Sequence, residues 1–242
     1  YYASRGLGDV YKRQIYMIGD STMSNKPLEG NNQERGWGHV LGSFFTEDVR
    51  VENHAMNGRS SKSFIDEGRW ETVVNKIRPG DYVFIQFGHN DEKPQPERHT
   101  DPGTTFDENL RKFVRETRAK GGIPVLFNSI VRRNFGVNPD AVAADDIRPE
   151  KDEAVVEGDT LIDTHGKYLE SPRNVAKEMD VCFIDLNQAT KKLVESYGVE
   201  GSKKLFMWIP ADTYAACPKG RQDNTHLNIY GCLLYTSDAA DE

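Results

Sequence analysis

The alternation of short β-prone runs with stretches of helical periodicity constrains this chain most strongly. Runs such as 82–87 (YVFIQF) end at a glycine, and apolar side chains then recur at helical spacing. The predicted strands are 15–18, 49–53, 82–87, 123–127 and 181–184, and the predicted helices are 37–45, 63–77, 106–117 and 186–197. Strands that alternate with helices form a parallel sheet covered on both faces. The sequence therefore predicts an α/β fold with a central parallel sheet.

The two ends of the chain do not fit this pattern. Residues 1–14 contain a basic patch, and residues 232–242 (CLLYTSDAADE) stand where a helix is expected after Tyr230. Both segments resemble translated sequencing-adapter read-through, so we expect them to be non-native tails. The expected organisation is a single domain from 15 to 231 without a terminal helix, in which the acidic stretch 134–164 forms a surface excursion.

Composition excludes several kinds of partner and cofactor. The 242 residues include 31 Lys and Arg against 38 Asp and Glu, a net charge of −7, without the basic stripe that nucleic acid requires. No run reaches the roughly 18–20 apolar residues of a membrane helix. The three cysteines lack a metal-type spacing, and Cys182 is expected in the core. We therefore expect no nucleic-acid partner, membrane insertion, metal or cofactor.

Polar residues follow the predicted strands, at the place where ligands bind in open α/β sheets. The usual serine-elbow, P-loop, dinucleotide and zinc-protease motifs are absent. Instead, Ser21 follows the first strand, Gly58 the second and Asn90 the third. Near the C-terminus, Asp223 precedes His226 by three residues. A lone serine here would more often be a helix cap, and a lone D-x-x-H is weak, but the four blocks together are specific.

These residue types suit the transfer of an acyl group. The Asn90 amide can donate hydrogen bonds to a developing oxyanion, and Gly58 lets a backbone N–H approach a ligand without a Cβ in the way. An aspartate beside a histidine fixes the tautomer of the imidazole and stabilises the imidazolium. We expect the strand-end residues to converge at one edge of the sheet, with His226 beside the Ser21 hydroxyl and Asp223 at the far ring nitrogen.

In order and content these blocks resemble the SGNH, or GDSL-type, hydrolase superfamily, and the likeness covers essentially all of the predicted domain. Within it, the chain is similar to the rhamnogalacturonan acetylesterase branch. The stretches that carry this likeness are 19–23 (GDSTM), 36–38 (GWG), 52–60 (ENHAMNGRS), 87–91 (FGHND) and 223–228 (DNTHLN). The resemblance implies a three-layer α/β/α, flavodoxin-like fold with a central parallel sheet.

The resemblance also implies a role for each residue. Ser21 would be the nucleophile, His226 the general base and then acid, and Asp223 the orienting carboxylate. The oxyanion hole would consist of the N–H groups of Ser21 and Gly58 and the amide of Asn90. The implied activity is a serine esterase that removes O-acetyl groups from plant cell-wall polysaccharide, rhamnogalacturonan or pectin, through an acetyl-serine. No signal peptide precedes the first strand, yet we expect the intact gene product to be secreted or periplasmic.

Further side chains are expected at the same rim. Arg132 and Arg133 follow the fourth predicted strand, and arginine suits bidentate recognition of the carboxylates of a galacturonate-containing polymer, although a solvated loop would explain them too. His89 neighbours Asn90 and is expected to line the cleft. Trp37 is expected to pack in the core. Two acidic residues beside the site, Asp20 and Asp91, are expected to hold loops by hydrogen bonds.

Two other functions remain open at this point. A lysophospholipase or thioesterase could use the same fold, because fold does not fix substrate. A non-catalytic glycan-binding module is the third hypothesis. The polar rim favours a sugar substrate over a lipid, and the presence of Ser21, Asp223 and His226 together argues against a module without activity. The sequence gives no oligomeric state.

Overall fold

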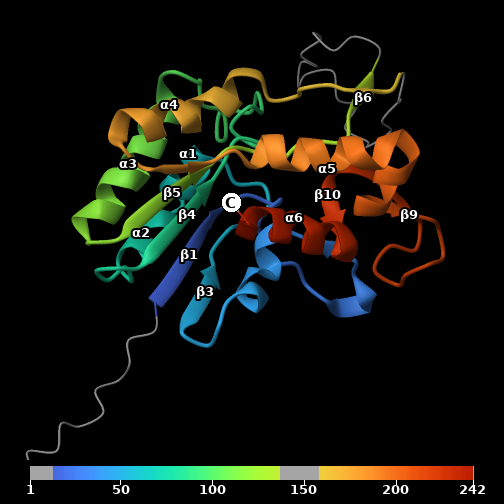
Figure 1. Ribbon diagram of the computed structural model, residues 1–242, viewed down its shortest axis with the longest axis horizontal. Coiled ribbons are helices and arrows are strands. Elements are labelled where there is room, and N and C mark those ends of the chain that lie inside the picture. The colour runs from blue at the N-terminus through green and yellow to red at the C-terminus, as the bar shows by residue number, and fades with distance from the viewer. Residues whose placement is uncertain (1–12, 137–157, 242) are drawn as a thin grey trace, which may run out of the picture.

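The computed structural model describes residues 13–136 and 158–241, and its centre is a parallel sheet of five strands in the order β3-β1-β4-β5-β8 (Figure 1). The strands are β1 (Arg13–Gly19), β3 (Val49–Asn53), β4 (Tyr82–Gln86), β5 (Ile123–Phe127) and β8 (Cys182–Ile184). Each predicted strand is therefore present, and the α/β fold with a central parallel sheet is confirmed.

Helices cover both faces of this sheet, which gives three layers (Figure 1). One face is covered by α1 (Ser61–Asp66), α2 (Arg69–Val74), α3 (Thr105–Ala119) and α4 (Glu170–Met179), and the other by α5 (Leu186–Gly201) and α6 (Ile229–Asp241). Side chains of a strand alternate between faces, so Tyr16 and Ile18 pack in the first core while Ile15 and Met17 pack in the second. Burial on both faces is typical of a parallel strand.

Two predicted helices differ from the structure. The segment 63–77 forms α1 and α2 instead of one helix, because Gly68 between them adopts φ +70°, which an α-helix cannot contain. The segment 37–45 forms two short 3-10 turns, Trp37–His39 and Leu41–Phe44. Its glycines at 38 and 42 weaken a regular helix. Trp37 is nevertheless fully buried, as predicted, and its Nε1 donates to Gln86 Oε1 at 2.6 Å.

The C-terminal segment corrects another expectation. Residues 232–241 form most of α6, so the prediction that the terminal helix is missing is wrong. Cys232, Tyr235 and Thr236 are fully buried, and Thr236 Oγ1 donates to the carbonyl of Trp37. Hydrophobic burial accounts for this helix whatever the origin of the segment. The non-native origin of both tails stays a prediction, and residues 1–12 lie outside the described residues.

Other parts of the chain lie around the main sheet. Cys182 is exposed at the start of the edge strand β8, so its predicted place in the core is wrong. Within the stretch 134–164, β6 (Phe135–Gly136) pairs with β7 (Thr160–Leu161), and residues 137–157 lie outside the described residues. Over the described part of the chain, no helix combines the length and apolar character needed to cross a bilayer.

A small antiparallel sheet completes the fold and matters most for the site. It consists of β2 (Glu34–Arg35), β10 (Arg221–Asn228) and β9 (Phe206–Ile209), in that order. Between Asp223 and Leu227 the register of β10 against β9 shifts, as in a β-bulge. Bulges re-aim side chains next to active sites, and His226 lies within this one.

Candidate active site

The loops that follow β1, β3 and β4 lie next to one another. These strands are neighbours in a parallel sheet, so their carboxyl ends meet at one edge. The Met56 N–H donates to Gly19 O at 3.0 Å, which holds the second loop against the end of β1. Ser24 Oγ donates to Asn57 Oδ1 at 2.6 Å, and Asn90 Nδ2 donates to the carbonyl of Arg59 at 3.1 Å. The loops that carry Ser21, Gly58 and Asn90 are therefore joined directly.

Ser21, His226 and Asp223 form one chain of hydrogen bonds. The Ser21 hydroxyl lies 2.9 Å from His226 Nε2, and His226 Nδ1 lies 2.7 Å from Asp223 Oδ2. With the ring proton on Nδ1, the ring donates to the carboxylate and accepts from the hydroxyl. This is the geometry expected from the sequence, and it matches the requirement for an activated nucleophile.

The bulge in β10 explains how an aspartate reaches a histidine three residues later. Asp223 Oδ1 accepts the backbone N–H of Thr225 at 2.7 Å and that of His226 at 2.9 Å, which leaves Oδ2 for the imidazole. Asp223 is fully buried. Burial acts to raise its pKa, but the hydrogen bonds from His226 and the charges of His226 and Arg221 outweigh burial and lower the pKa of Asp223. The lowered pKa favours the ionised form of the carboxylate that accepts from the imidazole.

The backbone of Gly58 and the side chain of Asn90, the expected oxyanion donors, are each held in a defined conformation. Gly58 adopts φ +73°, a region that residues with a side chain rarely enter, although no atom lies within 4 Å of the position a Cβ would take. Glycine is thus required by the backbone conformation rather than by crowding. Asn90 is buried, and its bond to the Arg59 carbonyl uses one amide hydrogen and orients the other.

The two neighbouring acids hold loops, as predicted. Asp20 accepts the N–H and the hydroxyl of Thr22, each at 2.8 Å. Asp91 accepts the N–H of Ser61 at 3.0 Å, the N–H of Gly88 at 3.1 Å and the hydroxyl of Thr100 at 3.0 Å. Burial raises the pKa of Asp91 to about 7, against the lowering effect of these bonds. Both acids shape the edge on which the site stands.

A charged network beside the triad was missed by the sequence analysis. Arg221 is ion-paired with Asp223 through Nη2 and with Glu34 Oε2, at 2.5 Å, through Nη1. Lys26 Nζ lies 2.8 Å from Glu34 Oε1 and 2.6 Å from Asn57 Oδ1. The strand period of two places Arg221 and Asp223 on one face, a signal that could have revealed the first of these contacts.

Arg133 does not lie at the rim. Its side chain is fully buried, with Nε on Ser202 Oγ at 2.9 Å and Nη1 on Asn224 Oδ1 at 3.1 Å. Its guanidinium also lies over the rings of Phe135 and Trp208. A fully enclosed guanidinium cannot recognise a polymer, so the predicted substrate contact is wrong for this residue.

Arg132 and His89 are buried as well. Arg132 is 2% exposed and ion-paired with Glu92, whose Oε2 also lies 2.9 Å from His165 Nδ1. His89 is 3% exposed, 3.5 Å from Asp20 Oδ2, and its ring meets that of His165 edge-on. Burial lowers the pKa of His89 to about 3, despite the opposing charge of Asp20. The expectation that these two side chains lie at the surface of the site is therefore wrong. Both are buried and contact other buried polar side chains.

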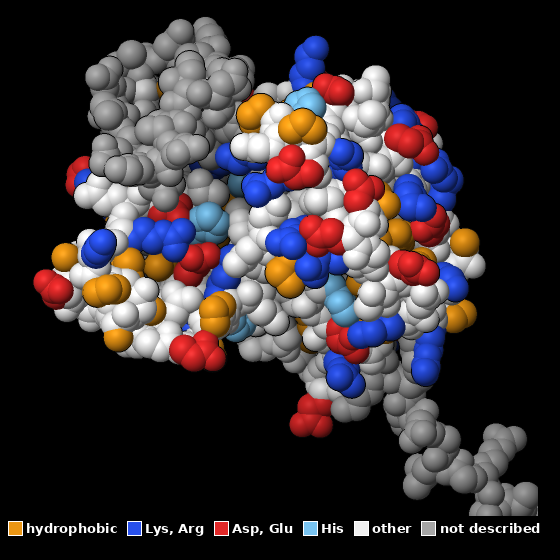
Figure 2. Space-filling model, turned by 180° about the vertical axis from the view of Figure 1, so that it is seen from behind, with side chains coloured by type: hydrophobic (Ala, Val, Ile, Leu, Met, Phe, Trp, Pro, Cys, Tyr) orange, Lys and Arg blue, Asp and Glu red, His pale blue; other side chains and the backbone are white. Residues whose placement is uncertain are grey.

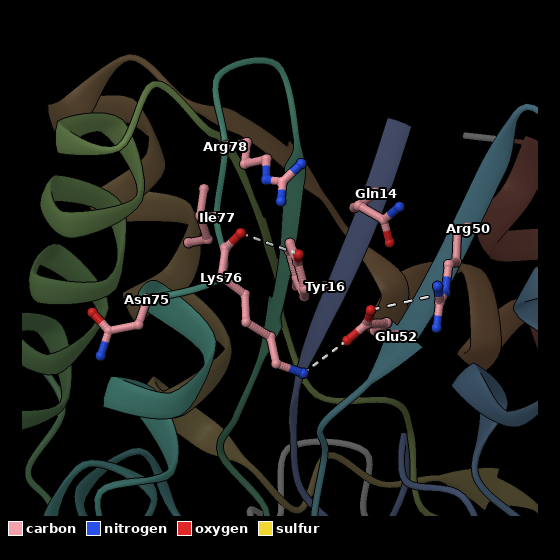
Figure 3. Close-up of a pocket in the computed structure, with 8 residues that line it drawn as sticks. All are labelled: Gln14, Tyr16, Arg50, Glu52, Asn75, Lys76, Ile77 and Arg78. Atoms are coloured by element: carbon pink, nitrogen blue, oxygen red, sulfur yellow. Dashed lines mark hydrogen bonds and ion pairs between the residues drawn. The ribbon is translucent and has the colours of Figure 1, made fainter. Parts of the chain in front are cut away.

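The described surface away from the triad is of mixed character. In the view of Figure 2, positive and negative side chains are interspersed and hydrophobic ones are scattered. Among the described residues, no group of three or more His, Cys, Asp or Glu side chains is placed to hold a metal ion. A hollow of about 380 Å³ lies at the amino ends of β1 and β3, away from the triad (Figure 3). It is lined by Gln14, Tyr16, Arg50, Glu52, Asn75, Lys76, Ile77 and Arg78.

Known proteins resemble the chain over nearly its full length. The model of the GDSL-like Lipase/Acylhydrolase family matches residues 17–228. RhgT, a rhamnogalacturonan acetylesterase of Bacillus subtilis (strain 168), is 39% identical over 91% of this chain and 84% of its own. YesY, a probable rhamnogalacturonan acetylesterase of the same strain, is 31% identical over 90% of this chain and 86% of its own.

Solved structures agree with the fold. The Bacillus subtilis protein YXIM superposes with a TM-score of 0.72 at 26% identity, over 96% of this chain and 56% of that chain. Axe2, an acetylxylan esterase from Geobacillus stearothermophilus, superposes with a TM-score of 0.60 at 17% identity, over 95% of this chain and 93% of that chain. At such identity the second likeness concerns the fold alone.

Proposed function

The chain belongs to the GDSL-like lipase/acylhydrolase family, and from this premise we propose that it is a serine esterase that removes O-acetyl groups from rhamnogalacturonan or a related pectic polysaccharide. The observation that carries the proposal is the hydrogen-bonded chain from Ser21 through His226 to Asp223. The substrate class rests on the relatives of 39% and 31% identity, both named for rhamnogalacturonan deacetylation, which cover about nine tenths of the chain.

The reaction begins at the Ser21 hydroxyl. His226 Nε2 takes the hydroxyl proton as Oγ attacks the acetyl carbonyl, and Asp223 stabilises the imidazolium through Nδ1. The oxygen of the tetrahedral intermediate becomes negative, and the N–H groups of Ser21 and Gly58 and the amide of Asn90 are the donors assigned to it. Each such donor typically contributes about 3–4 kcal/mol to the transition state.

Collapse of this intermediate breaks the bond to the sugar oxygen. The imidazolium of His226 gives its proton to that oxygen, so the polysaccharide leaves with a free hydroxyl and Ser21 carries the acetyl group. Water then attacks the acetyl-serine with His226 again as the base. A second tetrahedral intermediate collapses to acetate, and the proton returns to Ser21 Oγ. No cofactor takes part in this scheme.

The loops around Ser21 favour a polar substrate. Asn57, Arg59 and Asn90 stand on the second and third loops, whereas a lysophospholipase or long-chain thioesterase requires a continuous apolar groove for the acyl chain. Met56 is the large hydrophobic residue exposed on the second loop. A single exposed apolar side chain is ordinary for a protein surface and forms no groove.

Acetate release tests the proposal directly. We expect release from acetylated rhamnogalacturonan and not from the same polymer after alkaline deacetylation, with Ser21→Ala as the blank. A p-nitrophenyl ester series from acetate to decanoate should show kcat/KM falling as the chain lengthens. A maximum at long acyl chains would move the assignment to a lipid or thioester substrate, and binding of the polymer without release of acetate would make the protein a glycan-binding module.

We also propose that the intact gene product acts outside the cytoplasm, in the periplasm or after secretion. The support is the nature of the substrate, a wall polymer too large to enter a cell. Fractionation of cells that express the complete native gene, with immunodetection, tests this: recovery only with the cytosol would contradict it.

A further inference from the structure

We propose that Arg221, held in place by Glu34 and Lys26, is a positioning residue that sets the proton affinity of the His226–Asp223 pair. The inference rests on the proposed function, since it assigns to these residues a part in the same serine mechanism. Arg221 contacts Asp223, His226 and Glu34. It acts through Asp223 and His226.

The geometry of Arg221 is that of a fork between two carboxylates. Its Nη2 is ion-paired with Asp223 Oδ2, the oxygen that also accepts from His226, and lies 3.3 Å from His226 Nδ1. Its Nη1 lies 2.5 Å from Glu34 Oε2 on the neighbouring strand β2. A planar guanidinium with both ends fixed loses most of its freedom to rotate. The carboxylate that orients the imidazole is thereby itself oriented.

The support behind Arg221 is buried. The side chain of Lys26 is 2% exposed and that of Glu34 is 14% exposed. Burial acts to raise the pKa of Glu34, but the charges of His226, Lys26 and Arg221 together lower it to about 2. A buried lysine is costly unless it is paired, and Lys26 divides its ammonium between Glu34 and Asn57. One unbroken series of contacts therefore joins the triad acid to the residue before Gly58.

The charges that face His226 oppose one another. Asp223 and Arg221 face it from β10, Glu34 faces it from β2, and Lys26 stands behind Glu34. Next to Ser21 in the chain, Asp20 lies in a buried pair with His89. In general, a nearby positive charge disfavours an imidazolium and a nearby negative charge favours it. Removal of one or the other should therefore shift the activity profile in opposite directions.

The test compares pH profiles of kcat/KM for p-nitrophenyl acetate. In Arg221→Gln, the acid limb should move to higher pH by about 0.5–1 unit, a size reduced by the 30% exposure of the Arg221 side chain. In Glu34→Gln it should move to lower pH by a similar amount. Arg221→Lys keeps the charge, so its acid limb should stay with the wild type while kcat falls through loss of the fork.

Matched controls come from an ion pair far from the site. Arg111 on α3 holds Glu178 through Nε and Nη2, much as Arg221 holds its partners. Arg111→Gln and Glu178→Gln should leave the acid limb unmoved. Melting temperatures of all variants show which of them are folded, and if Arg221→Gln is not, the pair Glu34→Gln and Arg221→Lys still carries the comparison.

A second readout does not depend on the natural substrate. A fluorophosphonate probe forms an Oγ–P bond at Ser21, the P–F bond breaks, fluoride leaves, and the hydroxyl proton passes to His226. The pH profile of its labelling rate should shift as the kcat/KM profile does. If the wild type is labelled but releases no acetate from any ester, the proposed function fails while labelling still tests Arg221. The inference about Arg221 would be overturned if the acid limbs of Arg221→Gln and Glu34→Gln coincided with that of the wild type or moved in the same direction. The proposed function would not be affected by that result.

Discussion

The two ends of the central sheet both carry charged and polar side chains, but only the carboxyl end holds a linked catalytic triad. At the amino end, the hollow of Figure 3 is lined by charged side chains that reach water: Lys76 is 44% exposed and lies 3.0 Å from Glu52, and Arg50 is 69% exposed and lies 3.8 Å from Glu52. At the carboxyl end, Asp223 and Lys26 are enclosed and their contacts are fixed. Charged side chains are common to both ends.

The difference lies in how far water is excluded from the charges. A solvated ion pair contributes about 0–1 kcal/mol and can rearrange at little cost. Buried polar groups are held by hydrogen bonds that they cannot exchange for water, so their positions are set before a substrate arrives. Catalytic capacity therefore follows the preorganised buried network and not the size of a hollow.

The largest effect should follow from removal of the nucleophile. Ser21→Ala deletes the only atom that attacks the acetyl group, so kcat should fall by about 10⁴-fold or more without loss of the fold. Acetate release and circular dichroism measure the two quantities. Residual activity near the wild-type level, with contaminating esterase excluded, would contradict the assignment of this edge as the site.

A smaller loss is expected for one oxyanion donor. Asn90→Ala should lower kcat by about 10²–10³-fold with little change in KM, because in the proposed mechanism the amide acts on charge that develops only in the transition state. Steady-state kinetics with p-nitrophenyl acetate separates the two constants. A change confined to KM would instead make Asn90 a ground-state contact of the substrate.

Acid stability should distinguish the two ends. Glu34 has a pKa of about 2 in the folded protein against about 4.5 unfolded, so it stabilises the fold above pH 4.5 and that stability is lost as the pH falls toward 2. Glu34→Gln should lower the free energy of unfolding by about 1–3 kcal/mol at pH 7, and the deficit should shrink in acid. Urea denaturation at pH 7, 5 and 3 measures this.

Glu52→Gln is the counterpart of that variant at the amino end. Glu52 also has a lowered pKa: burial opposes the lowering, which comes from Lys76, His54 and Arg50. Its solvated ion pairs should be worth only about 0–1 kcal/mol at pH 7. If the free energy of unfolding of Glu52→Gln changed with pH as steeply as that of Glu34→Gln, the two ends of the sheet would not differ in the strength of their ion pairs.

The smallest effect should come from the hollow itself. Lys76→Met removes one of its cations and should change kcat/KM for acetylated rhamnogalacturonan by less than about two-fold, since surface substitutions away from a site have small effects. Fragments of the polymer titrated against wild type and variant provide a binding measurement. A large loss of activity on the polymer, with p-nitrophenyl acetate hydrolysis unchanged, would show that this hollow binds substrate.

The residues placed well by sequence reasoning obey a local rule. Ser21, Gly58 and Asn90 each follow a β-prone run, and neighbouring parallel strands bring their ends together without further information. The Asp223–His226 pair needed only its own spacing and the strand that carries it. The order of these sequence blocks along the chain, with Ser21 first and His226 last, then indicated acyl transfer.

The residues placed badly depend on distant parts of the chain. Arg133 follows β5 and looked like a rim residue, yet Asn224, 91 positions away, and Ser202 enclose it. Arg221 escaped notice because its partner Glu34 lies 187 positions away. Residues 232–241 were expected to lie outside the fold because they resemble a non-native tail. Their apolar side chains at helical positions nevertheless suffice for burial in α6. The local sequence pattern around a residue does not show which distant segments will bury it.

The 205 positions between Ser21 and His226 impose an order in time on this enzyme. A ribosome adding about 5–20 residues per second needs roughly 10–40 s to make the intervening chain. Throughout that interval the nascent protein holds a serine without its base and cannot attack an ester. Because Ser21 follows β1 and His226 lies on β10, detachment of either strand from the fold would separate the pair and abolish hydrolysis. Activity therefore requires both ends of the domain to be folded.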